Sequence, residues 1–198
     1  MAQEPSSPPW WRRAIRVGLL SFLLAAVVNY LGQEALESVP ALVAMLIILM
    51  LITVGISFDI LGTSVTAAEV TPLNAMAAKR LSGARQAIFL VRNADRVANF
   101  ANDVVGDVTG AVTGAAGSTV AMQLSTGKDF TDTLLSLAII GLVAGLTVGG
   151  KAAGKTFAIE HATDVLVLVG RAIHTVERMI GRSLTGGRGP NSSRRRTT

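Results

Sequence analysis

Three polar side chains in the region 97–124 are candidates for a shared chemical role, because they recur at intervals of four in an otherwise apolar sequence. Asn99, Asp103 and Asp107 would lie on one face of an α-helix. Gly106 and Gly110 lie beside that face, where a neighbouring helix could approach closely. Carboxylate and carbonyl oxygens are ligands that hard divalent cations such as Mg²⁺ prefer. The pattern therefore favours an ion pathway or a binding cavity.

Further ionisable side chains interrupt the apolar sequence at Asp59, Glu69 and Lys151. A charged side chain that faced lipid at the centre of a bilayer would cost roughly 3 kcal/mol or more. These groups must therefore face protein, water or one another. One interpretation is a polar site for a cation, and the other is a static pair between helices, such as Lys151 with Asp103 or Asp107. Carboxylates outnumber the available ammonium group, which favours the cation site.

Four long apolar stretches must position these residues. Of the 198 residues, 50% are hydrophobic and 16% are charged, whereas about a quarter of a soluble domain is charged. About 20 apolar residues cross a bilayer as one helix. The first stretch could instead be a signal peptide, but it lacks a small-x-small cleavage site, which favours a retained helix. We expect transmembrane helices at Val17–Leu31, Ala41–Ser64, Val97–Leu124 and Leu134–Gly150.

The distribution of positive charge predicts the topology of these helices. Arg and Lys gather before the first stretch, between the second and the third, and after the fourth. Basic segments of this kind face the cytoplasm. The sequence thus predicts an all-α polytopic protein of the cell membrane, with four transmembrane helices and both termini in the cytoplasm. The formal charge of +5 then reflects topology, and the expected partner is the lipid bilayer rather than nucleic acid.

The chain divides into four parts by composition. Residues 1–13 form a tail that we expect to be disordered, and residues 14–157 form the transmembrane domain. Residues 158–183 carry apolar side chains at helical spacing, which predicts a cytoplasmic juxtamembrane amphipathic helix. This helix could lie on the membrane surface or pair with a second copy of the chain. Residues 184–198 form a basic tail that we also expect to be disordered.

Glycine recurs at intervals of four from Gly106 to Gly114 and from Gly141 to Gly149. Small residues at this spacing let helix backbones approach closely within a membrane. We therefore expect both rows to lie at helix–helix contacts. Glycine-rich helices can also unwind locally and present carbonyl oxygens to an ion, and this reading is compatible with packing.

Motifs of soluble enzymes are absent from the sequence. It has no cysteine, and its two histidines lie too far apart to suggest a zinc site. Gly149–Thr156 ends in Gly-Lys-Thr like a phosphate-binding loop, but such a loop follows a buried strand in a soluble α/β domain. We therefore expect neither nucleotide binding at this segment nor enzymatic activity.

Three short motifs occur in a distinctive order, with VTAAEVTPL at Val65–Leu73, NADR at Asn93–Arg96 and GKAAGKT at Gly150–Thr156. Together with the amphipathic stretch that follows, they resemble successive segments of the membrane domain of the CNNM/CorC (CorB) magnesium transporters. The resemblance covers residues 47–183. It implies a three-helix core, to which Val17–Leu31 adds an extra N-terminal helix, and a homodimer that holds Mg²⁺ near the middle of the membrane.

Carried over to this chain, the resemblance implies a candidate Mg²⁺ site of Thr66, Asp103 and Asp107. Thr66 takes the position of a serine in the first family helix, and either aspartate falls near an asparagine of the second. Lys151 takes the position of the glutamate that ligates the ion in the third family helix. The remaining candidates for an ion site or a charge pair are Lys151, Glu69 and Asn99.

Lys151 leaves two functional hypotheses open. The first is transport of Mg²⁺ or a similar divalent cation through the polar site, for which Lys151 must swing aside or lose its proton when buried. The alternative is a non-transporting membrane scaffold or regulatory partner, in which the Lys151 ammonium plugs the ion site and repels a cation. The sequence lacks the nucleotide-binding CBS domains of many family members, so regulation would need a soluble partner chain.

Overall fold

The computed structural model describes residues 10–125 and 129–181, and every element within these ranges is a helix. The predicted all-α fold is confirmed. The tails expected to be disordered lie outside the described residues, except that α1 begins at Trp10 and so includes residues 10–13. The elements in chain order are α1 (Trp10–Glu37), α2 (Ala41–Ala67), α3 (Val70–Ala78), α4 (Ala84–Arg92), α5 (Ala94–Ala98), the π-helix η1 (Asn99–Gly106), α6 (Asp107–Leu124), α7 (Phe130–Glu160) and α8 (Ala162–Ile180).

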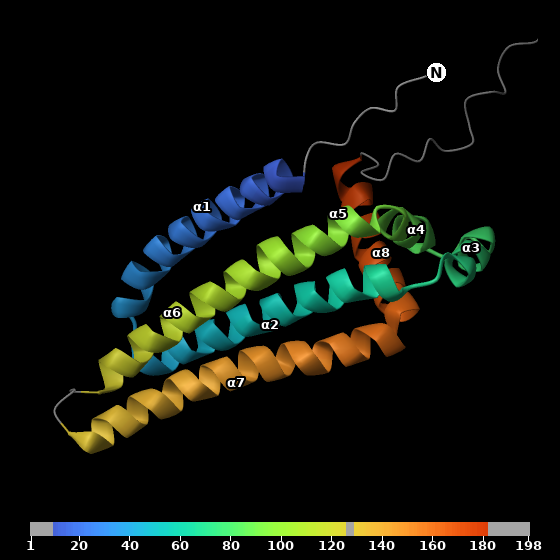
Figure 1. The fold of residues 1–198 in the computed structure, drawn as a ribbon. Coiled ribbons are helices and arrows are strands. Elements are labelled where there is room, and N and C mark those ends of the chain that lie inside the picture. Colours follow the sequence, from blue (N-terminus) through green and yellow to red (C-terminus); the bar gives the residue numbers. More distant parts are fainter. Residues whose placement is uncertain (1–9, 126–128, 182–198) are drawn as a thin grey trace, which may run out of the picture.

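The long helices lie side by side in an elongated bundle (Figure 1). α2, α6 and α7 pack on one another, and α1 packs on the outer side of α6. α3, α4 and α8 gather at the end of the bundle where α2 and α7 end, and α4 packs against α8. We call these three helices the helical cap.

The described residues form two separate apolar cores, and α2 contributes to both. The first core lies within the bundle and includes Ile48 of α2 and Val120 of α6. The second core lies under the helical cap and includes Val65 of α2 and Leu166 of α8. Residues 57–60 of α2 therefore lie between the two cores.

Two helices in the described ranges, α2 and α7, are long and apolar enough to cross a membrane. α2 has 27 residues and a mean hydropathy of 2.8 in its most apolar window, and α7 has 31 residues and a value of 2.0. Each begins at or near the residue where the sequence predicts a span, and each continues beyond the predicted end. The apolar part of α1, Ala14–Tyr30, is shorter.

The predicted helix Val97–Leu124 is not one continuous α-helix, because part of it is the π-helix η1. Residues of a π-helix donate to a carbonyl five positions earlier instead of four, as the N–H of Asp107 does to the carbonyl of Asn102. π-Helical segments are rare and occur frequently at functional sites. This bonding widens the turn and interrupts the regular α-helical hydrogen-bond ladder between Asn99 and Gly106.

The glycine row that begins at Gly141 makes no helix–helix contact within the described part of this single chain, which differs from the expectation. A Cβ added at any glycine of this row would meet no described atom within 4 Å. α7 meets α2 instead at Gly150 and Gly154, where an added Cβ would lie 2.3 Å and 3.0 Å from the nearest isoleucine atoms of α2. In the other row, a Cβ added at Gly106 would contact atoms of Asp59 and Lys151. A Cβ added at Gly114 would meet no described atom within 4 Å.

Two glycines let α4 and α8 cross at short distance in the helical cap. Gly83 precedes α4 with a φ of +87°, a conformation that glycine adopts without strain. A Cβ on Gly170 of α8 would lie 2.2 Å from the carbonyl oxygen of Gly83. The obstacle is a backbone atom, which cannot rotate away as a side chain would.

Gly170→Ala is therefore expected to lower the free energy of unfolding by about 1–3 kcal/mol, the usual cost of forcing extra volume into a packed contact. Gly145→Ala is the matched control, because it makes the same change in a helix where the added carbon meets open space. The measurement is thermal unfolding of the purified full chain, followed by circular dichroism. Equal midpoints for the two variants would show that α4 and α8 do not cross this closely.

Candidate functional site

A buried carboxylate lies between the two apolar cores. Asp59 of α2 is 3% exposed. Its Oδ2 atom lies 3.9 Å from Nζ of Lys155 on α7, and it accepts no hydrogen bond from any described residue. An ionised carboxylate at this depth needs an opposite charge or hydrogen bonds to offset its lost hydration. Lys155, with 57% of its side chain exposed, supplies that charge from the edge of the helix contact.

A second lysine lies one turn earlier on α7. Nζ of Lys151 donates a hydrogen bond to the carbonyl oxygen of Gly106 at 2.9 Å and lies 3.7 Å from Oδ1 of Asp107. The side chain of Lys151 is 20% exposed and that of Asp107 is 76% exposed. Because an ion pair with one exposed partner stabilises little in water, the bond to the Gly106 carbonyl is what fixes the ammonium group.

Gly106 is the position where α2, η1 and α7 come together. A Cβ at this residue would lie 3.2 Å from Oδ1 of Asp59 and 3.5 Å from Nζ of Lys151. The missing side chain therefore lets a carboxylate from α2 and an ammonium group from α7 reach the same stretch of backbone.

Asn102 lies one turn before Gly106 on η1 and packs on Gly62 of α2. A Cβ at Gly62 would overlap the Asn102 amide, so a larger residue there would displace it. Oδ1 of Asn102 is buried and, like Oδ2 of Asp59, has no hydrogen-bond partner among the described residues. Buried polar atoms of this kind commonly bind an ordered water molecule or an ion.

We call this set of residues the polar layer: Asp59, Asn102, Gly106, Asp107, Lys151 and Lys155. Its two carboxylates and two ammonium groups form two ion pairs, so its formal charges balance. Within residues 10–125 and 129–181, no three His, Cys, Asp or Glu side chains are grouped so that they could hold a metal ion. A divalent cation would also meet repulsion from both ammonium groups. As arranged, each carboxylate of the polar layer lies beside a lysine.

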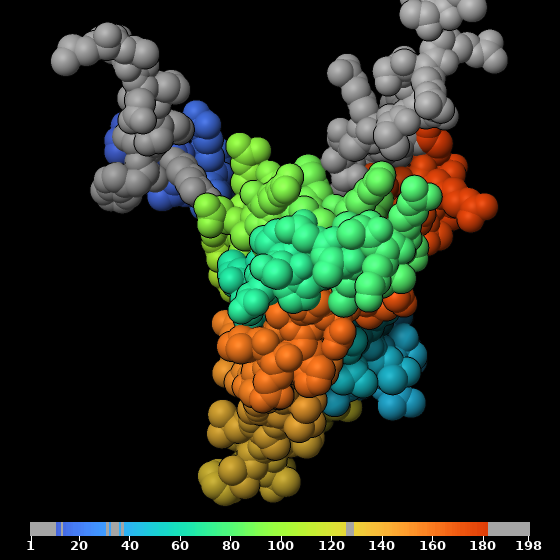
Figure 2. All heavy atoms as spheres, turned by 90° about the vertical axis from the view of Figure 1, so that its right-hand side faces the viewer, coloured from blue at the N-terminus to red at the C-terminus, as the bar shows by residue number. Residues whose placement is uncertain are grey.

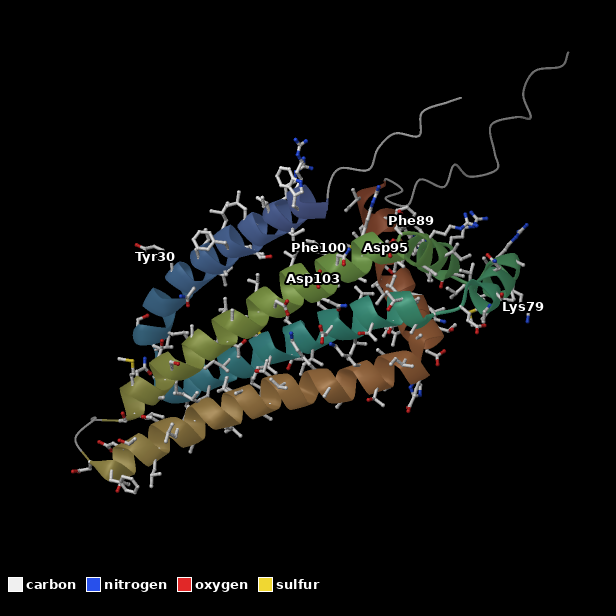
Figure 3. All side chains as sticks on the ribbon, viewed as in Figure 1. Tyr30, Lys79, Phe89, Asp95, Phe100 and Asp103 are labelled. Carbon is white, nitrogen blue, oxygen red and sulfur yellow. The ribbon has the colours of Figure 1, made fainter. Side chains whose placement is uncertain are left out.

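The aspartates predicted to share a face point to different places. Asp103 and Asn99 line a groove of about 600 Å³ between η1 and α1, together with Arg96. Figure 3 shows Asp103 and Phe100 on the side of the helix that faces α1. Asp107 instead reaches Lys151 on α7.

The structure does not bring Thr66 or Glu69 to the polar layer. Thr66 follows Asp59 by seven residues, which is about 10 Å along the helix. Its hydroxyl donates to the carbonyl of Thr63 at 2.9 Å. Glu69 is exposed at the start of α3. The residues proposed to hold Mg²⁺ are therefore not gathered at one place.

Asn102 and Lys155 belong to the polar layer but were not singled out from the sequence, whereas Asp59 was named there as an ionisable residue of the apolar stretches. One signal was available, because Lys151 and Lys155 lie four residues apart on an apolar helix and so share a side. Two ammonium groups on such a face require carboxylates opposite them. No comparable signal identifies Asn102, because its contact with Gly62 depends on how η1 packs on α2.

No protein-family model matches this sequence, and neither a characterised protein nor a solved structure shows significant similarity to it. The resemblance to the CNNM/CorC membrane domain therefore rests on the short motifs at residues 65–73, 93–96 and 150–156. The function has to be inferred from the chain's own side chains and their geometry.

Lys155→Gln is expected to lower the free energy of unfolding by about 1 kcal/mol, because it leaves the Asp59 carboxylate buried without its partner. Asp59→Asn in the same chain is expected to restore most of that loss, since no buried charge then remains. A double-mutant cycle of chemical unfolding measures the coupling, which we expect to be about 1 kcal/mol. Lys79→Gln, an exposed change in the helical cap, is the control. Additive effects of the two substitutions would contradict the pairing.

Proposed function

We propose that this chain is an integral protein of the cell membrane. α2 and α7 have the length and hydropathy of spanning helices, yet only 22% and 11% of their most apolar windows are buried inside the protein. The core helix of a soluble protein would be mostly buried. Leu42, Met50 and Leu142 are instead exposed by 74%, 69% and 52%. Lipid is the environment that suits large apolar faces of this kind.

The proposed topology has four spanning segments, namely α1, α2, η1 with α6, and α7. The helical cap carries basic residues that include Lys79, Arg85 and Arg92, and the positive-inside rule assigns such a segment to the cytoplasm. Both termini would lie on that side. The apolar face of α8 supports a place in the cap, because its Leu166 is buried in the second core rather than turned toward lipid.

Within the membrane, the geometry best supports a non-transporting scaffold or regulatory partner whose ion site is plugged by Lys151. The observation that carries this proposal is the Lys151 ammonium group, bonded to the Gly106 carbonyl at 2.9 Å and 3.7 Å from Asp107. The exposed Asp107 side chain adds a second argument. A carboxylate that is 76% exposed on a spanning helix needs water, a second copy or another protein beside it rather than lipid.

Transport of Mg²⁺ or a similar cation is the second candidate, and two oxygen atoms favour it. Asp59 Oδ2 and Asn102 Oδ1 are buried without hydrogen-bond partners in the described part of the chain. Oxygen is the ligand atom that Mg²⁺ prefers. The motif resemblance points the same way, and it would make the functional unit a homodimer with a soluble regulatory partner. For a cation to bind, Lys151 and Lys155 would have to move away from the carboxylates. Neither candidate is an enzyme.

The proposed topology can be tested with single cysteines, because the sequence has none of its own. Ser82→Cys in the helical cap is expected to react with a membrane-impermeant maleimide only from the cytoplasmic side. Ser38→Cys and Asp129→Cys, at the far ends of the spans, are expected to react only from the opposite side. Labelling is measured in sealed right-side-out and inverted vesicles, and labelling in detergent gives the total. Reaction of all three from one side would contradict the topology.

The plugged site is tested by Lys151→Glu, which replaces the ammonium group by a third carboxylate. The wild-type chain is expected to show no Mg²⁺-dependent change in its thermal unfolding. The variant is expected to gain about 1.4 kcal/mol at roughly ten times the Kd, a rise in midpoint of about 3–5 °C. Lys79→Glu makes the same change of charge outside the polar layer and is expected to give no response.

Flux in proteoliposomes separates the two candidates. A scaffold is expected to give Mg²⁺ flux equal to that of empty liposomes. Flux above this background that falls in Asp59→Asn would overturn the scaffold and support transport.

A further inference from the structure

A cavity of about 520 Å³ opens in the helical cap, apart from the polar layer. It lies between the turn from α3 to α4, the outer side of α4 and the C-terminal part of α8. Figure 2 shows this end of the molecule, with α3 and α4 in teal to green toward the viewer. No residue of the polar layer lines the cavity, so it is a separate feature.

Three arginines line this cavity. Arg85 and Arg92 are seven residues apart on α4, so they lie on one side of that helix, with Phe89 between them. Arg80 comes from the turn after α3. A guanidinium group presents a planar set of donors that matches the oxygens of a phosphate or a carboxylate. Guanidinium groups from two elements around one hollow are the arrangement that recognition of an anion needs.

Arg80 occupies its position in a strained backbone conformation. Its φ is +57°, and the other positive φ angles in the described residues belong to Gly83 and Gly181. Glycine is the usual residue at a left-handed position after a helix. An arginine at this position therefore strains the local backbone. Its side chain adds a third guanidinium group to the cavity.

The carboxylate in the wall of the cavity is already engaged by a neighbouring helix. Glu177 of α8 is 8% exposed, and its Oε2 accepts a hydrogen bond from Nε2 of Gln86 on α4 at 2.7 Å. The same nitrogen lies 3.3 Å from Nδ1 of His174. This network ties α4 to α8 beneath the arginines. Because three arginines face one glutamate, the cavity keeps an excess of positive charge.

We propose that this cavity binds a phosphate-bearing anion, either the head group of an anionic phospholipid or free phosphate. Leu81 and Phe89 line the same cavity beside the arginines and are 46% and 39% exposed. This mixture suits a lipid, whose phosphate would meet guanidinium groups while its glycerol and acyl carbons meet apolar side chains. Anionic lipids are enriched on the cytoplasmic face, where the proposed topology puts the cap. The site itself does not depend on whether Lys151 plugs the polar layer.

The test uses the purified full chain in neutral detergent, with thermal unfolding as the measurement. The probes are phosphatidylglycerol, phosphatidylcholine, and sodium phosphate compared with sodium chloride at equal ionic strength. Phosphatidylglycerol at about ten times its Kd is expected to raise the midpoint by about 3–5 °C. Arg85→Gln combined with Arg92→Gln is expected to abolish the rise. Lys79→Gln combined with Arg178→Gln removes the same charge from the cap outside the cavity and is expected to keep it.

Each result has a defined meaning for the proposed site. A rise with sodium phosphate alone that the Arg85/Arg92 variant abolishes would support the site and identify free phosphate as its ligand. An equal rise in the cavity variant and the control would reduce the effect to general attraction between a basic surface and an anionic lipid, which overturns the proposal. The absence of any rise in the wild-type chain would overturn it as well.

Arg80→Gly separates binding from folding if the double variant proves unstable. Glycine relieves the left-handed strain, so this variant is expected to unfold at a higher temperature without lipid. It is also expected to lose about half of the lipid-induced rise, because one of three guanidinium groups is gone. A weaker response in a more stable protein cannot result from misfolding. An undiminished response would contradict the proposed site.

Discussion

A carboxylate buried among apolar helices must have positive charge within reach, and the centre of this molecule is built around that requirement. Asp59 is almost wholly enclosed, and Lys155 reaches it from the neighbouring helix. Gly106, at the point where α2, η1 and α7 meet, leaves room for Oδ1 of Asp59 because it lacks a side chain. Gly106 and Lys155 thus both accommodate this buried carboxylate, whereas Lys151 pairs with Asp107.

The polar layer also separates the apolar core of the bundle from the core under the helical cap. The apolar core of the bundle and the core under the helical cap are not continuous, because the charged and amide groups lie between them. Apolar packing is tolerant of small shifts, whereas hydrogen bonds and ion pairs depend on direction and distance. The bond from Lys151 to the Gly106 carbonyl therefore fixes the alignment of α7 with η1 more sharply than the surrounding aliphatic contacts can.

The sequence predicts the long elements well and their mutual contacts poorly. Apolar runs mark α2 and α7 because helix length and hydropathy are local properties. The static pair of Lys151 with Asp107 was one of two alternatives, and it is present in the structure. The pair of Asp59 with Lys155 was not predicted, because it depends on the register of two helices far apart in the chain. The glycine row at Gly141 meets no other helix of the described chain, since periodicity identifies a face but not the helix that covers it.

The π-helix η1 affects how the face that α6 turns toward α7 depends on the length of the chain before it. In an α-helix each added residue turns everything after it by about 100°. The looser bonding of η1 takes up a surplus residue without passing that rotation on to α6. Loss of a single residue between Asn99 and Gly106 would remove the surplus, so the segment would become α-helical while α6 keeps the same side toward α7. This segment can therefore lose one residue without the change of inward face that the same loss would cause in the α-helical part of α6.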